Sequence, residues 1–141
     1  MKLVLFLFLL IPFESISQDY TYGNLATDLL DMCFWNYSRV ELHLKIKKIP
    51  FEYTEFTNGN GFLIKSTDSE IAFGFQDKEP KQILYRFIKD KMGDLDKEVY
   101  YIYLNAICGE NIYGEWLYKN GPANVFIRFN SEYNGFVISK D

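Results

Sequence analysis

The chain has 141 residues, a formal net charge of −4 and an aromatic content of 18%. Nucleic-acid binding depends on concentrated positive charge, so an acidic chain whose one small basic group lies at residues 45–48 argues against that function. A single histidine and two cysteines exclude sites in which several His or Cys side chains hold a metal, and we expect no cofactor.

The first 17 residues have the organisation of a cleavable signal peptide. Lys2 gives a basic start, an apolar run follows at residues 3–13, and Ser15 and Ser17 precede the expected cut. The run is shorter than the roughly 20 residues that cross a membrane. We therefore expect residues 18–141 to form one domain with no membrane span, secreted or periplasmic. The alternative is a buried N-terminal strand.

Two segments with different periodicity follow the cut. Apolar residues at spacings of three and four predict a helix over residues 23–35, with Asn24 at its start. Residues 39–47 alternate between apolar and polar side chains, which predicts a half-buried strand with His43 on its polar face.

Turn residues and a change of period divide the middle of the chain. Residues 51–56 and 62–65 flank the Asn-Gly-Asn-Gly turn of a predicted hairpin, and a strand is expected at residues 70–75. Pro80, an apolar stripe and Gly93 predict a second helix over residues 77–93. A strand at residues 83–88 is the competing interpretation, because Tyr85 and Phe87 favour strands.

The last third predicts strands joined by short turns, at residues 99–107, 112–118, 123–129 and 136–139. Residues 99–104 are apolar or aromatic on both alternating faces, which indicates that this segment is covered on two sides. The expected fold class is α+β: a twisted, mainly antiparallel meander of about seven or eight strands with two helices packed on it.

The cysteines and carboxylates allow several alternatives. Cys33 and Cys108 either form one disulfide, as an oxidising compartment permits, or remain two buried thiols. A hydrolase would have to use His43, or Glu110 with Glu115 as an acid and base pair. Asp94, Asp96 and Glu98 alternate like the first ligands of a calcium loop, but the later glycine and glutamate are missing, so solvated carboxylates are expected.

The aromatic residues suggest the leading functional hypothesis. Many of the 11 Tyr and 13 Phe must belong to the core. Several others fall in neighbouring predicted strands, and the candidates for ligand binding are Tyr101, Tyr103, Trp116 and Tyr118. We expect a small exported, non-enzymatic binding protein for an apolar or carbohydrate ligand. The alternatives are an interaction factor that inhibits a protein partner, as immunity proteins do, and the hydrolase described above.

Overall fold

The computed structural model describes residues 20–57, 59–76, 79–120 and 123–141. The predicted signal peptide lies outside these residues. In the described part of the chain, no helix has the length and hydrophobicity needed to cross a bilayer.

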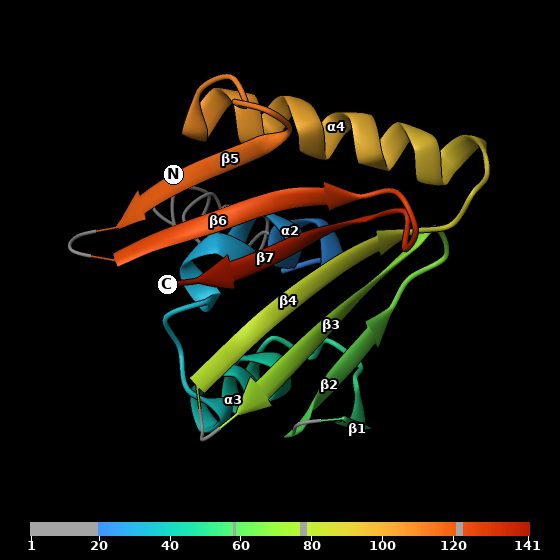
Figure 1. Ribbon diagram of the computed structural model, residues 1–141. Helices are drawn as coiled ribbons and strands as arrows, with labels where there is room; N and C mark the ends of the chain where they lie inside the picture. The colour runs from blue at the N-terminus through green and yellow to red at the C-terminus, as the bar shows by residue number, and fades with distance from the viewer. Residues whose placement is uncertain (1–19, 58, 77–78, 121–122) are drawn as a thin grey trace, which may run out of the picture.

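The fold is α+β, as predicted, and is built on one antiparallel sheet with the strand order β1-β2-β3-β4-β7-β6-β5 (Figure 1). The strands are β1 (Glu52–Phe56), β2 (Gly59–Lys65), β3 (Ser69–Gln76), β4 (Glu79–Phe87), β5 (Glu115–Asn120), β6 (Ala123–Asn130) and β7 (Gly135–Lys140). The described helices are α2 (Tyr22–Met32), α3 (Tyr37–Ile46) and α4 (Lys91–Cys108). The sheet consists of two meanders, β1–β4 and β5–β7, joined by the pairing of β4 with β7.

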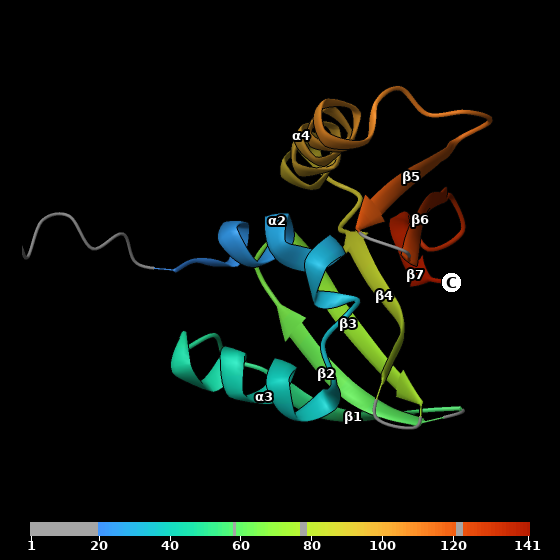
Figure 2. The ribbon, with the colours of Figure 1, turned by 90° about the vertical axis from the view of Figure 1, so that its left-hand side faces the viewer.

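The helices lie on one side of the sheet (Figure 2). Strand residues alternate accordingly: in β3, Ile71, Phe73 and Phe75 are buried while their neighbours are not. The same alternation buries Ile83 and Tyr85 in β4. The core therefore fills the space between helices and sheet, and the opposite face of the sheet has no covering layer in the described residues.

The strand predicted over residues 39–47 is wrong, because residues 39–46 lie in helix α3 and Lys47 is its C-cap. The side chain of Asn36 caps this helix and accepts a hydrogen bond from the Arg39 backbone N–H at 2.8 Å. Helical spacing buries only Val40 and Leu44, and it leaves Leu42 exposed. The apparent alternation arose because exposed apolar residues filled the positions between the buried ones.

The prediction of a helix over residues 77–93 was also wrong, because most of this segment is strand β4. Ile83, Tyr85 and Phe87 alternate toward the core, which confirms the competing interpretation. Pro80 pairs with Phe75 next to a register shift in the ladder between β3 and β4. Proline has no backbone N–H to donate to a neighbouring strand. It is tolerated at such an irregularity because the sheet does not require that hydrogen bond there.

Residues 99–107 belong to helix α4 and not to a strand. The Asp90 side chain caps the helix by accepting from the Gly93 N–H at 2.7 Å, and Gly109 ends it at φ 80°. Tyr100 and Leu104, four residues apart, are buried against the sheet. The local preference of Val, Ile and Tyr for strands is thus overridden by helical capping and by packing on one face.

The remaining predictions agree with the structure within a few residues. The predicted helix at 23–35 is α2, although Thr21 is its N-cap and Asn24 completes the capping box. The hairpin, the third strand and the final three strands are β1 to β3 and β5 to β7.

Tyr100 is fully enclosed in the core, and its hydroxyl has no hydrogen-bond partner among the described residues. Burial raises the pKa of this hydroxyl well above its ordinary value. Tyr103, one turn away, instead donates its hydroxyl to the Thr27 carbonyl at 2.7 Å. Two neighbouring tyrosines of the same helix therefore differ in whether the hydroxyl has a hydrogen-bond partner.

This difference predicts that replacing tyrosine by phenylalanine changes the free energy of unfolding in opposite directions at the two positions. Tyr100→Phe should raise the free energy of unfolding by about 1 kcal/mol, because it removes an unsatisfied buried hydroxyl. Tyr103→Phe should lower it by about 1 kcal/mol through loss of a hydrogen bond. Urea unfolding of both variants tests this, and equal destabilisation by the two substitutions would contradict it.

Candidate functional site

The face of the sheet that points away from the helices, here called the open face, carries side chains with few internal contacts. Its central row runs through Ala72, Leu84 and Val137, which are paired neighbours on β3, β4 and β7. These side chains are small or of medium size and half-buried. The row therefore forms a low apolar floor between bulkier residues on either side.

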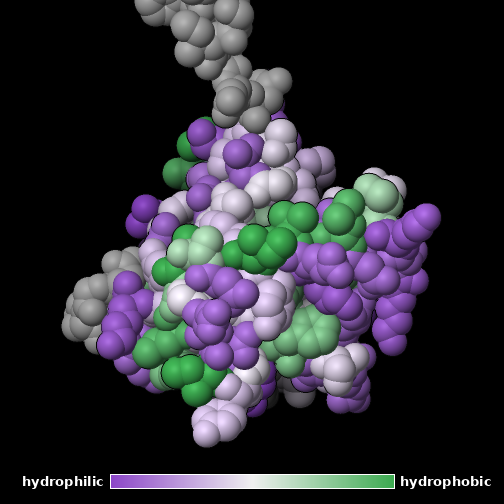
Figure 3. Space-filling view, turned by 90° about the horizontal axis from the view of Figure 1, so that it is seen from above, coloured by the Kyte–Doolittle hydropathy of each residue, from purple (hydrophilic) through white to green (hydrophobic). Residues whose placement is uncertain are grey.

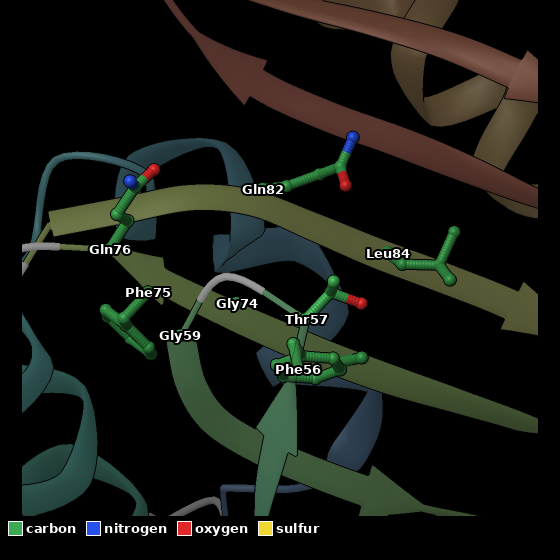
Figure 4. A pocket seen from close by; sticks show the side chains of 9 residues that line it. Phe56, Thr57, Gly59, Gly74, Phe75, Gln76, Gln82 and Leu84 are labelled. Carbon is green, nitrogen blue, oxygen red and sulfur yellow. The ribbon is translucent and has the colours of Figure 1, made fainter.

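A hollow of about 360 Å³ lies at one end of the open face, over β2 to β4 (Figure 4). Its floor includes Gly74, which pairs with Gly61 on β2 and with Gln82 on β4. A Cβ on Gly61 would stand 1.6 Å from the Phe73 carbonyl oxygen and 2.9 Å from the Phe56 ring. Glycine is thus required where Phe56 leans across the sheet.

The walls of this hollow combine one aromatic ring with two amides. Phe56 is 41% exposed, and Gln76 and Gln82 are exposed on neighbouring strands. In the described residues, neither glutamine side chain forms a hydrogen bond with another residue. Each amide has both donors and acceptors, so the hollow offers directional polar contacts beside an apolar surface.

A second hollow of about 540 Å³ shares Gln82 and Leu84 with the first and extends over β5 to β7. It is lined further by Phe126, Asn130 and Tyr133. The two hollows therefore adjoin at Gln82 and Leu84, and we call the pair of them the open-face groove.

The charged side chains beside the groove are paired with each other. The Arg128 guanidinium donates to the Glu115 carboxylate at 2.9 Å, and both residues line the second hollow. Arg86 forms an ion pair with Glu70 on the adjoining row. The groove thus presents neutralised charges, together with amide, hydroxyl and aromatic groups.

The four aromatic residues predicted to bind a ligand lie on the helix side of the sheet. The Trp116 side chain is 2% exposed, and its indole N–H donates to the Asn105 side chain at 2.9 Å. The Tyr101 ring packs edge-on against it, with ring centroids 4.9 Å apart. Both residues line a pocket of about 420 Å³ beside α4, which Phe129 also lines.

Tyr103 links helix α4 to helix α2, and Tyr118 links strand β5 to helix α2. The Tyr118 hydroxyl donates to the Asp31 carboxylate at 2.9 Å, and the Tyr103 hydroxyl donates to the backbone of α2. The structure therefore brings Tyr101 and Trp116 together at one pocket, while the hydroxyls of Tyr103 and Tyr118 are engaged with α2. Phe56 in the groove is 41% exposed, close to the 42% of Tyr101 beside α4.

The disulfide considered from the sequence is not formed, because Cys33 and Cys108 are both free thiols. Burial raises the pKa of the Cys33 thiol to about 12. Burial also raises the pKa of the Cys108 thiol, which is less enclosed at the end of α4. Since oxidation and alkylation proceed through the thiolate, both groups have low reactivity in the folded chain.

Alkylation tests this arrangement. With iodoacetamide at pH 8, the folded protein should be modified at Cys108 first, and Cys33 should react only after unfolding in guanidinium. Intact-mass spectrometry counts the modified thiols, and peptide mapping locates them. A native mass two hydrogens lower, with no alkylation after unfolding, would contradict the free-thiol state.

His43 lies in the helical layer, contrary to the prediction of an exposed strand position. The Tyr20 hydroxyl donates to Asp28 at 2.7 Å and lies 3.1 Å from His43 Nε2, so that nitrogen carries the proton and donates to Tyr20. The ring also packs edge-on against Trp35. Burial lowers the His43 pKa, despite the opposing effect of Asp28.

The residues considered for hydrolysis are not assembled into one site. His43 belongs to the helical layer, whereas Glu115 lies on the open face in its ion pair with Arg128. Glu110 is exposed in the turn after α4. Among the described residues, no group of three or more His, Cys, Asp or Glu side chains is placed to hold a metal. Asp94, Asp96 and Glu98 are part of helix α4 and do not form a loop.

The groove residues Phe56, Gln76 and Gln82 were not predicted from the sequence. One usable signal was present, because Gly61 and Gly74 interrupt two strands at positions where a side chain is expected. Comparisons with protein-family models, with curated proteins and with solved structures find no match for this chain.

Proposed function

We propose that this protein is an exported, non-enzymatic binding module that holds a neutral carbohydrate chain in the open-face groove. The observation that carries the proposal is the exposed Phe56 ring beside the amides of Gln76 and Gln82, which form no hydrogen bond with another described residue. A sugar ring has an apolar C–H face, which packs on an aromatic ring, and hydroxyl groups that both donate and accept hydrogen bonds. An aromatic ring next to amides matches both properties.

The charges around the groove favour a neutral ligand. Arg128 and Glu115 neutralise each other inside the second hollow, and Arg86 and Glu70 do so beside it. A charged ligand would have to compete with these ion pairs and leave one partner without its counter-charge. A polyhydroxylated ligand can hydrogen bond to the same groups without separating them.

The extent of the groove favours a chain of several sugar units. Its two hollows, of about 360 and 540 Å³, adjoin at Gln82 and Leu84. Each is within the roughly 300–1,000 Å³ typical of small-molecule sites. Phe126 and Tyr133 in the second hollow provide further rings on which additional units would pack.

Export and the absence of a catalytic step are parts of this proposal. The signal-peptide pattern of residues 1–17 would place the protein where envelope and extracellular polysaccharides occur. The Glu115 carboxylate is engaged by Arg128, and His43 belongs to the other side of the sheet. These placements support a groove that holds its ligand without cleaving it.

An array of immobilised neutral oligosaccharides, followed by calorimetry with the best soluble binder, tests the proposal. Phe56→Ala and Gln82→Ala should each weaken binding about tenfold, which corresponds to roughly 1.4 kcal/mol. Both side chains are exposed, so the stability of the fold should change little.

Tyr113→Ala is the matched control, because this fully exposed ring lies in the turn before β5, outside the groove. It should bind the oligosaccharide as the wild type does. Failure of the wild-type protein to bind any neutral oligosaccharide at millimolar concentration would reject the proposal, as would unchanged binding by Phe56→Ala.

A further inference from the structure

Helix α4 has a second apolar face that the fold leaves uncovered. Its outward side carries Met92, Leu95, Val99 and Ile102, which are 52%, 50%, 58% and 67% exposed. Ala106 continues the same row. We call these five residues the α4 stripe. In Figure 3, which looks down on the α4 side of the molecule, apolar side chains gather across this surface.

The α4 stripe is opposite the side of the helix that builds the core. Gly93, Tyr100 and Leu104 face the sheet, roughly half a turn around the helix axis from Leu95 and Ile102. A single-sided surface helix needs only one apolar stripe. The second stripe therefore indicates an interaction that the isolated chain does not make, since contiguous exposed apolar surface of this kind marks an interface.

The spacing of the stripe is that of a helix-pairing seam. Its residues recur at intervals of three, four, three and four, the pattern by which two α-helices interlock their side chains. A helix with the same pattern is the complementary surface, and α4 of a second copy has it. A symmetric contact of this kind closes after two copies and exposes no further apolar face.

The charges that flank the stripe select the relative direction of the two helices. Lys91 and Glu98 lie along one side of it, and Asp96 lies along the other. In an antiparallel pair, Glu98 of one copy would approach Glu98 of the other near the centre. In a parallel pair, Lys91 of each copy would instead approach Asp96 of the other.

Asp96 is a carboxylate on the flank of the α4 stripe. Among the described residues it forms no ion pair. Burial and the neighbouring carboxylates of Asp68 and Asp90 raise its pKa. Lys91 is exposed and likewise has no carboxylate partner in the described part of the chain. Within the described residues, each copy therefore has an unpaired cation and an unpaired anion on opposite sides of the α4 stripe.

We propose that the α4 stripe is a homodimer interface, in which α4 packs parallel to α4 of a second copy and Lys91 of each copy pairs with Asp96 of the other. The open-face groove takes no part in this contact. Failure of carbohydrate binding would leave this proposal unaffected.

Sedimentation equilibrium of the protein purified from an exporting host, over a wide concentration range, tests the interface. The wild type should show a reversible equilibrium between monomer and dimer. Ile102→Glu should raise the dissociation constant at least about tenfold, because it places a charge in the centre of the apolar seam. The exposure of this side chain means that the monomer should retain its fold.

Ile46→Glu is the matched control, since Ile46 is 64% exposed on α3, a different helix. It should dimerise as the wild type does. A wild-type protein that stays monomeric over the whole range would overturn the proposal. Dimerisation of Ile102→Glu at the wild-type strength would overturn it too.

A charge exchange tests the parallel direction. Lys91→Asp should weaken the dimer roughly threefold to tenfold, since it replaces two symmetric ion pairs by repulsion. Adding Asp96→Lys to this variant should restore the wild-type dissociation constant, because the exchanged charges attract again. A double variant that dimerises no better than Lys91→Asp would overturn the parallel arrangement.

Discussion

Burial of aromatic side chains on one face of the sheet is the interaction on which the rest of this structure depends. Tyr100 of α4 packs against Tyr85 of β4 and against Phe136 of β7, with ring centroids 4.9 and 5.1 Å apart. These contacts join both meanders to the long helix. Large rings bury much apolar area per residue, which allows a small domain to be stabilised with a single covering layer.

One-sided burial explains the properties of the two surfaces that remain. The open face needs side chains that tolerate water, and it has a low apolar floor edged by amides and paired charges. Its glycines let Phe56 lie across the sheet instead of projecting from it. Helix α4 packs on the core through Tyr100 and Leu104. The apolar residues on its outer side therefore remain exposed to a partner.

The fold class was predictable because turn residues and alternating strands dominate the chain, whereas three segments were assigned to the wrong element. In residues 39–47, the exposed residues Leu42 and Ile46 gave the sequence the alternating apolar pattern of a strand. In residues 79–87, Pro80 imitated a helix start, although it lies beside a ladder irregularity. In residues 99–107, β-branched and aromatic residues favoured a strand, although the segment is helical. The N-cap of this helix, Asp90, precedes the predicted strand by several residues.

The candidate site was less predictable than the fold, because it depends on which side of the sheet each residue faces. Trp116 was predicted to bind a ligand because of its large aromatic ring, but packing in the folded structure buries it. Glutamines at positions 76 and 82 are ordinary in a sequence, and they become informative only when adjacent strands place them around a hollow. The apolar character of residues 99–104 on both sides was visible, and its explanation is a helix with two apolar faces.

The central claim is that the open face binds the ligand while the opposite face is closed by helices. A titration followed by ¹H–¹⁵N NMR, with the neutral oligosaccharide that binds most tightly, tests this most directly. The account predicts chemical-shift changes at Gly61, Gly74, Gln82 and the Gln82 side-chain amide, and unchanged amides in α2 and α3. Shift changes confined to Tyr101, Asn111 and their neighbours beside α4 would contradict it, because they would place the ligand in the pocket on the helix side.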